Sequence, residues 1–158
     1  MKKIRCFLLI IFITLISCGC SSKSVSNEFI EVSKNIKNEI EINTENITST
    51  ATFANYSYDG VIIQFILVRG TDGIVRIAFN TCQACNPSPT AYFIQKGEYL
   101  ECQNCKNKFH IDKIGEEKGG CNPAPVEKKT IKGEKIVIDA SYVESMKEKF
   151  ENWKGKVK

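Results

Sequence analysis

Two pairs of cysteines carry the clearest chemical signal in this chain. Cys82 and Cys85 form one Cys-x-x-Cys pair, Cys102 and Cys105 form another, and residues 86–101 separate them. A three-residue step in a tight turn brings two sulfur atoms to one side, so two such turns can present four thiolates to a common point. Zn²⁺ accepts four thiolates as a tetrahedral site, and iron–sulfur clusters use the same donors. The spacing predicts a metal site without choosing the metal, and structural disulfides are the remaining alternative.

A fifth cysteine, Cys121, stands in the stretch Gly-Gly-Cys-Asn-Pro. Gly120 before it suits a close approach of the backbone. Three roles are open for Cys121: a ligand in place of one of the other four, a neighbour of the site, or a buried structural thiol. His110 is the only histidine, and we expect it to face solvent or to bond the backbone rather than to hold a metal.

The N-terminus has the pattern of an export signal. A positively charged head at residues 2–5 precedes an apolar run at residues 7–16. This run is too short to cross a bilayer, which takes about 20 apolar residues, and is typical of a secretory signal. The alternatives are an ordinary signal peptide cut nearby and an uncleaved anchor.

The end of this segment, Leu15-Ile16-Ser17-Cys18, resembles a bacterial lipobox. The resemblance implies cleavage before Cys18 and attachment of lipid to its sulfur. We therefore predict a lipoprotein signal peptide at residues 1–17, a lipid-anchored tether and N-terminal segment at 18–49, and a four-cysteine metal domain at 50–158. The protein is expected on the extracytoplasmic face of a cell membrane, where disulfides persist.

Charge and motif content exclude several functions. The net charge is +4, but lysines mingle with acidic residues along the chain, which indicates a solvated surface rather than a nucleic-acid site. There is no Ser/His/Asp set, no phosphate-cradling glycine loop and no convincing pair of carboxylates. Nothing in the sequence indicates a hydrolase or a transferase.

Alternating β-prone segments and turns predict a mainly β domain. Residues 61–68, a turn at residues 70–73 and residues 74–79 read as a hairpin that delivers Cys82. Residues 91–94, a turn at 96–98 and residues 99–101 repeat the device and deliver Cys102, and residues 131–138 form a late hairpin. Residues 28–43 read as a strand or a short helix. Ser141 and Glu144 form a capping box, and the apolar spacing after them predicts a C-terminal helix packed on the sheet.

The two hairpins resemble the two-loop layout of Rieske proteins, in which two loops grip a [2Fe–2S] cluster. The stretches "ILVRGTDGIVRIAFNTCQAC" and "LECQNCKNKFHIDKIGEEKGG" carry this resemblance. Cys85 and Cys105 stand where histidine is expected in a Rieske loop, and four thiolates favour a lower reduction potential. The implied fold is Rieske-like or rubredoxin-like, with antiparallel hairpins carrying the two Cys-x-x-Cys tips.

A closer resemblance covers roughly residues 50–153. The stretches "VRIAFNTCQACNPSPTAYF", "CQNCKNKF", "IDKIG" and "GGCNPAP" together resemble the membrane iron–sulfur FtrD-like family, which is associated with bacterial iron transport. The resemblance implies an iron–sulfur cluster of unknown type near Cys82, Cys85, Cys102, Cys105 and Cys121. Two features depart from the family: we expect a lipid anchor in place of the multi-span membrane part to which the family is often fused, and residues 86–89 lack the more usual glycine.

These patterns lead to one functional hypothesis and two alternatives. We expect an extracytoplasmic, membrane-anchored iron–sulfur protein that transfers one electron and is not itself a catalyst. Its expected partners are the membrane, through the lipid anchor, and an iron permease or a redox membrane protein. The alternatives are a structural zinc module of zinc-ribbon type that binds a partner, and a metal-delivery protein.

Overall fold

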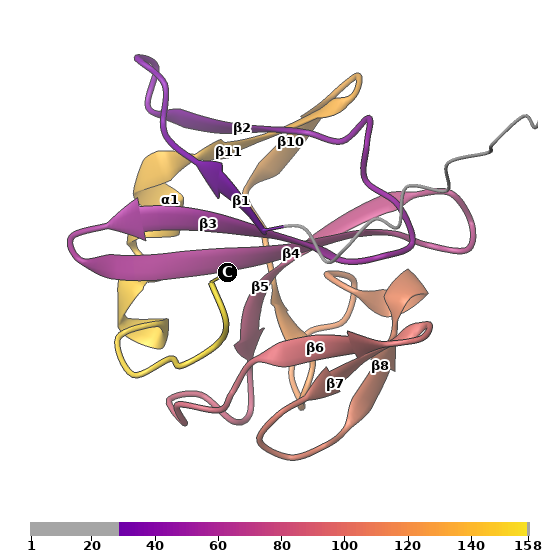
Figure 1. Cartoon of the computed structure of the whole chain (residues 1–158). Coiled ribbons are helices and arrows are strands. Elements are labelled where there is room, and N and C mark those ends of the chain that lie inside the picture. The colour runs from indigo at the N-terminus through magenta and orange to yellow at the C-terminus, as the bar shows by residue number, and fades with distance from the viewer. Residues whose placement is uncertain (1–28, 158) are drawn as a thin grey trace, which may run out of the picture.

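The computed structural model of the chain describes residues 29–157. The predicted signal peptide and Cys18 lie outside the described residues. The described part is mainly β, with three sheets and a short C-terminal helix (Figure 1), which confirms the predicted fold class.

A five-stranded sheet forms the centre of the fold. Its order is β1 (Phe29–Val32), β3 (Thr52–Tyr58), β4 (Val61–Arg69), β5 (Val75–Cys82) and β9 (Pro123–Pro125). β1 runs parallel to β3, and the other neighbours are antiparallel. The predicted turn at residues 70–73 is present, and Gly73 has a φ of 80° between β4 and β5. Asp59 and Gly60 also have positive φ, in the turn between β3 and β4.

Two three-stranded sheets flank the central one (Figure 1). One contains β10 (Lys129–Lys132), β11 (Lys135–Asp139) and β2 (Glu39–Asn43), and the other contains β6 (Phe93–Lys96), β7 (Tyr99–Cys102) and β8 (Lys108–His110). For residues 28–43 the sequence did not decide between a strand and a short helix. The described part of this stretch forms two strands, β1 and β2, in two different sheets.

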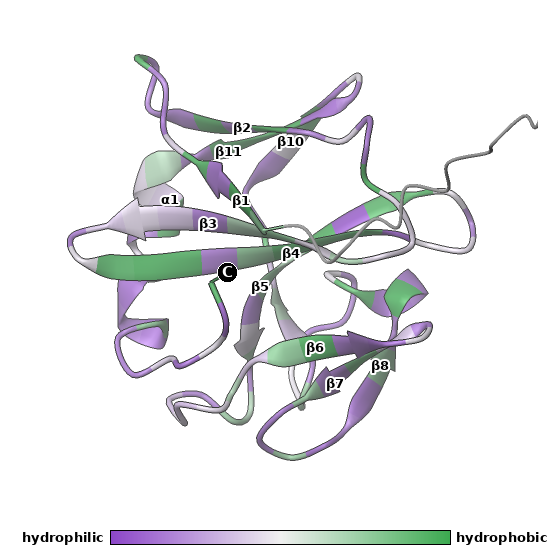
Figure 2. Cartoon of the chain, viewed as in Figure 1, coloured by the Kyte–Doolittle hydropathy of each residue, from purple (hydrophilic) through white to green (hydrophobic). Residues whose placement is uncertain are grey.

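The central sheet separates two hydrophobic clusters, because apolar side chains occupy both faces of β4, whose ribbon is largely green in Figure 2. On one face Phe65, Phe79 and Ile63 pack with β2, β11 and the C-terminal segment. On the other face Ile66 and Val68 pack with the β6–β8 sheet and the cysteines. The second cluster is the one that positions the site.

The C-terminal helix is shorter than predicted and has a different cap. α1 spans Ala140–Glu144 and is followed by a 3₁₀ turn, η2, at Lys147–Lys149. The Asp139 side chain caps it by accepting a hydrogen bond from Tyr142 N at 2.9 Å, so the predicted capping role of Ser141 is wrong. The Ser141 hydroxyl instead accepts a hydrogen bond from Asn38 at 2.8 Å.

The predicted apolar stripe of this segment does pack on the sheet. Val143 and Phe150 are buried against the central sheet, and Trp153 packs edge-on against Phe150 with ring centroids 5.7 Å apart. Burial of the stripe, rather than helix length, therefore fixes the position of the C-terminal segment.

Candidate metal centre

Three segments deliver thiols to one place. The first turn (residues 82–86) begins at the last residue of β5, and the second turn (residues 102–106) connects β7 to β8. The third arm (residues 115–122) leads into β9 and carries Cys121. Because β9 pairs with β5, with Pro123 opposite Cys82, the third arm ends beside the first turn.

The two Cys-x-x-Cys turns share one backbone geometry. In the first turn Asn86 N donates to Cys82 O at 3.0 Å, and in the second turn Lys106 N donates to Cys102 O at 2.9 Å. Against the larger effect of burial, the backbone N–H groups of Ala84 and Cys85 act to lower the pKa of Cys82, and those of Asn104 and Cys105 act to lower the pKa of Cys102. Such N–H donors stabilise negative charge on a thiolate, so both turns are shaped to hold anionic sulfur.

Each turn is fastened to a different neighbour. Gln83 N donates to Asn122 O at 3.1 Å, which ties the first turn to the third arm. Gln103 N donates to Tyr92 O at 2.7 Å, and Asn104 Oδ1 accepts from the Ser88 hydroxyl at 2.8 Å, which ties the second turn to the loop after the first. The relative positions of the three segments are therefore set by hydrogen bonds as well as by packing.

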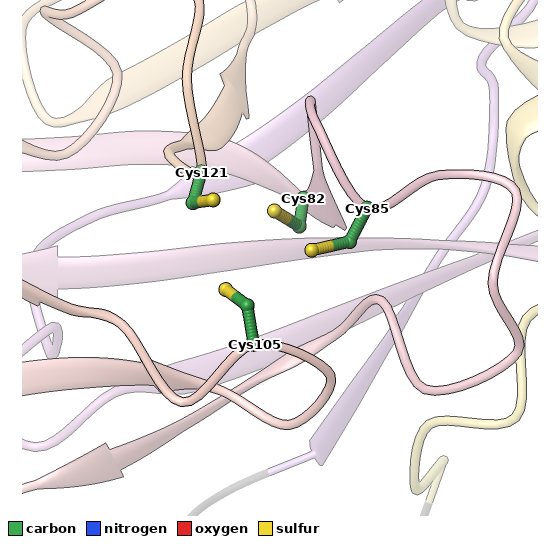
Figure 3. A group of neighbouring side chains, drawn as sticks. All are labelled: Cys82, Cys85, Cys105 and Cys121. Atoms are coloured by element: carbon green, nitrogen blue, oxygen red, sulfur yellow. The ribbon is translucent and has the colours of Figure 1, made fainter.

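Four sulfur atoms converge on a common point (Figure 3). Those of Cys82, Cys85, Cys105 and Cys121 all lie within 4.8 Å of one another. The sulfur of Cys102 lies 3.9 Å from that of Cys85 but falls outside this mutually close group. All five cysteines of residues 29–157 are free thiols. The structure thus brings together all five cysteines that the sequence singled out in the domain.

The thiol group has a buried side and an exposed edge. Cys82 and Cys102 are fully buried, whereas Cys85, Cys105 and Cys121 are partly exposed. Apolar side chains close the buried side, where the rings of Phe93 and Phe109 meet edge-to-face with centroids 6.1 Å apart. Phe109 therefore packs in the same hydrophobic cluster as the cysteines, while Tyr92 packs against Trp153.

The thiols differ in their acidity because their surroundings differ. Burial raises the pKa of Cys82 well above its ordinary value and that of Cys102 to about 11. Burial acts in the same direction on Cys105, but the N–H of Asn107 and hydrogen bonds with Cys102, Cys121 and Cys85 lower its pKa to about 7. A hydrogen bond with Cys105 raises the pKa of Cys121. Cys105, at the exposed edge, is therefore a thiol whose pKa lies near neutral pH.

His110 and the acidic residues near it lie outside the thiol group. His110 Nδ1 accepts a hydrogen bond from Asp112 N at 3.3 Å, as expected for a histidine that bonds the backbone. The carboxylate of Asp112 accepts hydrogen bonds from Thr71 N and the Thr71 hydroxyl at 2.7 and 2.6 Å. Among the described residues, the cysteines alone make up a group of potential metal donors of this kind.

The donor set fits a four-thiolate metal centre. It offers sulfur alone, backbone N–H groups that stabilise negative charge on Cys82, and an apolar wall on one side, which are the features that hold zinc or an iron–sulfur cluster. Sequence reasoning missed β9, because Pro-Ala-Pro has no strand signal. The only hint of its role was the Cys-Asn-Pro that precedes it.

This site and fold belong to a class of membrane proteins that contain iron and sulfur. The family model described as "Membrane iron-sulfur containing protein FtrD-like" matches residues 47–150, and the chain belongs to this family. A comparison with curated proteins gives no match. Within residues 29–157, no helix has the length and apolar character needed to cross a membrane.

Proposed function

We propose that the protein is an extracytoplasmic electron carrier, anchored to a bacterial membrane through Cys18, that serves an iron-transport or membrane redox system. The observation that carries the proposal is the convergence of Cys82, Cys85, Cys105 and Cys121 within 4.8 Å in a chain of the iron–sulfur FtrD-like family. These four residues are the proposed ligands, with Cys102 as a fifth thiol in contact with Cys85.

The chemistry of such a centre is one-electron exchange, because an iron–sulfur cluster bound by thiolates takes up and releases single electrons at a potential set by its surroundings. The chain contributes to that potential through the N–H groups of Ala84 and Cys85 in the first turn, which stabilise negative charge on the sulfur atom of the proposed ligand Cys82. Burial by Phe93 and Phe109 acts in the opposite direction, because it disfavours charge.

The exposed edge supports exchange with a partner. Cys85, Cys105 and Cys121 are partly exposed, so a redox protein or an iron permease could approach the centre there. The three segments that hold the thiols are fastened to one another by hydrogen bonds, so little movement of the chain is needed when the charge of the centre changes.

Metal and sulfide analysis tests the proposal. The full-length chain, purified without oxygen, should contain iron and acid-labile sulfide, and it should give an electron paramagnetic resonance signal in one of its redox states, before or after reduction with dithionite. Stoichiometric zinc without sulfide would contradict electron transfer and favour the zinc module, since four mutually close thiols also suit a single tetrahedral ion. An export and labelling assay of a Cys18→Ser variant tests the anchor separately.

A further inference from the structure

The side chain of Gln83 joins the first turn to the third arm. Its Oε1 accepts a hydrogen bond from Gly119 N at 3.0 Å, and its Nε2 makes longer contacts with Glu117 O at 3.5 Å and Pro123 O at 3.4 Å. We propose that Gln83 is a positioning residue that places the thiol of Cys121 in the metal centre. This inference rests on the proposed function in that the centre holds a metal, but it does not depend on which metal.

The third arm has few other means of staying in place. Gly115, Gly119 and Gly120 all have positive φ, and an added Cβ at Gly119 or Gly120 would meet no atom within 4 Å. In the described part of the chain, the hydrogen bonds that join the backbone of residues 117–122 to another segment all involve Gln83. Other polar links of the arm are the hydrogen bond of Cys121 with Cys105 and the exposed ion pair of Lys118 with Glu127. The ion pair is expected to contribute little.

The contact of Gln83 is specific to the third arm. Gln103 occupies the same position in the second turn, but its Nε2 donates to Glu101 O at 3.0 Å and its Oε1 accepts from Lys106 at 3.4 Å. Both partners of Gln103 belong to or adjoin its own turn. The chain therefore contains a matched control, since Gln83 and Gln103 have the same side chain in equivalent turns, and only Gln83 contacts the arm with Cys121.

The first test needs no metal. In the reduced, metal-free full-length chain, Gln83→Ala should raise the rate at which iodoacetamide labels Cys121 by about tenfold. The arm then loses the side-chain hydrogen bonds of Gln83 and, of its hydrogen bonds to the first turn, keeps only the backbone one from Gln83 N to Asn122 O, so it opens more readily. Gln103→Ala should leave that rate unchanged, and peptide mass spectrometry distinguishes Cys121 from the other cysteines. Gln83→Glu keeps an acceptor for Gly119 N but loses the Nε2 donor, so it should restore part of the protection.

The second test concerns the metal itself. Co²⁺ titration against a competing chelator should show that Gln83→Ala lowers affinity by about 10- to 100-fold, as is usual when a residue that orients a ligand is lost. The Gln103→Ala chain should bind Co²⁺ as the unmodified chain does. Equal labelling of Cys121 in the two alanine variants would overturn the inference. Equally faster labelling of all five cysteines of residues 29–157 would also overturn it. A zinc-containing natural protein would contradict the electron-transfer proposal and leave the positioning role intact.

Discussion

Cys82 lies opposite Pro123 where β5 pairs with β9. Pro123 is two residues beyond Cys121 in the chain. The register is shifted between Phe79 and Cys82, so the strand bends as it reaches the site. This single pairing joins the first Cys-x-x-Cys turn to a cysteine far along the chain. It explains how Cys121 comes to lie within 4.8 Å of Cys82, Cys85 and Cys105.

Replacement of Cys121 by serine should therefore affect mainly metal affinity, whereas replacement of Cys102 by serine should affect mainly stability. Cys121 belongs to the mutually close group, whereas Cys102 lies behind Cys85 and is fully buried. We expect Cys121→Ser to lower Co²⁺ affinity by at least about tenfold with little loss of stability. Cys102→Ser should keep one binding site but lower the free energy of unfolding by about 1–3 kcal/mol, since it places a hydroxyl in an apolar pocket.

Chelator competition and urea unfolding measure the two effects separately. If Cys102→Ser abolishes metal binding while Cys121→Ser preserves it, the two Cys-x-x-Cys pairs alone make the centre. The proposed ligand set would then be wrong.

The sequence predicts the hairpins well because their signals are local. Runs of β-prone residues on both sides of turns at Gly73 and Gly97 define β4–β5 and β6–β7, and each of these strand pairs ends at a cysteine. The pairing of β9 with β5 is different, since it depends on contacts across the chain and on three residues, of which two are prolines without an N–H to donate. Periodicity cannot reveal such a strand, so only the family resemblance, and not the residue pattern, predicted that Cys121 lies near the site.

Division of the strands into three sheets was also beyond the sequence. The sequence of a strand does not show which other strand it pairs with. β1 pairs in parallel with β3, although all of the predicted hairpins are antiparallel. The cap at Asp139 was missed for a similar reason. The pattern of Ser141 and Glu144 fits a capping box, but Glu144 instead binds Lys34 and Tyr56, which only the fold brings near.

Asn80 should be important for holding the β6–β8 sheet onto the central sheet. Its Nδ2 donates to Gln64 Oε1 at 2.6 Å, and its Oδ1 accepts from Phe93 N at 2.7 Å, in a region where all three residues are buried. Asn80→Ala removes the hydrogen bonds of two buried groups, Gln64 Oε1 and Phe93 N. Each group left without its partner costs about 1–3 kcal/mol of stability. We expect a loss of about 2–5 kcal/mol in urea unfolding, by the same principle.

The control for Asn80 is Asn43→Ala, which removes one exposed hydrogen bond that Asn43 Oδ1 accepts from Glu45 N. It should cost less than about 1 kcal/mol. Because β6 leads to the second turn, faster labelling of Cys105 should accompany the Asn80 variant and not the Asn43 variant. Equal stability of the two variants would contradict a role for Asn80 in joining the sheets.

The helix cap gives a prediction that separates the structure from the sequence pattern. Asp139→Ala removes the acceptor for Tyr142 N and should lower the free energy of unfolding by about 1 kcal/mol. Ser141→Ala keeps this cap and loses only the exposed hydrogen bond from Asn38, so its effect should be smaller. Thermal unfolding of the two variants in one buffer measures the difference. A larger loss of stability in Ser141→Ala than in Asp139→Ala would mean that Ser141 caps the helix after all.

Glu144 should give the protein part of its stability against acid. Its carboxylate accepts a hydrogen bond from Lys34 at 2.7 Å, and this bond, with that of the Tyr56 hydroxyl at 2.8 Å, holds the pKa of Glu144 below its ordinary value. Because the folded pKa is depressed, the unfolded chain binds the proton more readily than the folded chain. The contribution is therefore present above the pKa of an unfolded glutamate, about 4.3, and it is lost as the pH falls through the folded value.

Glu144→Gln should remove this part of the pH dependence. At pH 7 it should cost about 1 kcal/mol, the usual net value of a hydrogen bond, and the difference from the unmodified chain should shrink as the pH falls below about 4. Lys34→Met should reproduce most of the change, because the Lys34 hydrogen bond is the largest cause of the depressed pKa. Urea midpoints measured between neutral and acidic pH test this. If the difference in stability between Glu144→Gln and the unmodified chain grows as the pH falls, another carboxylate controls the loss of stability in acid.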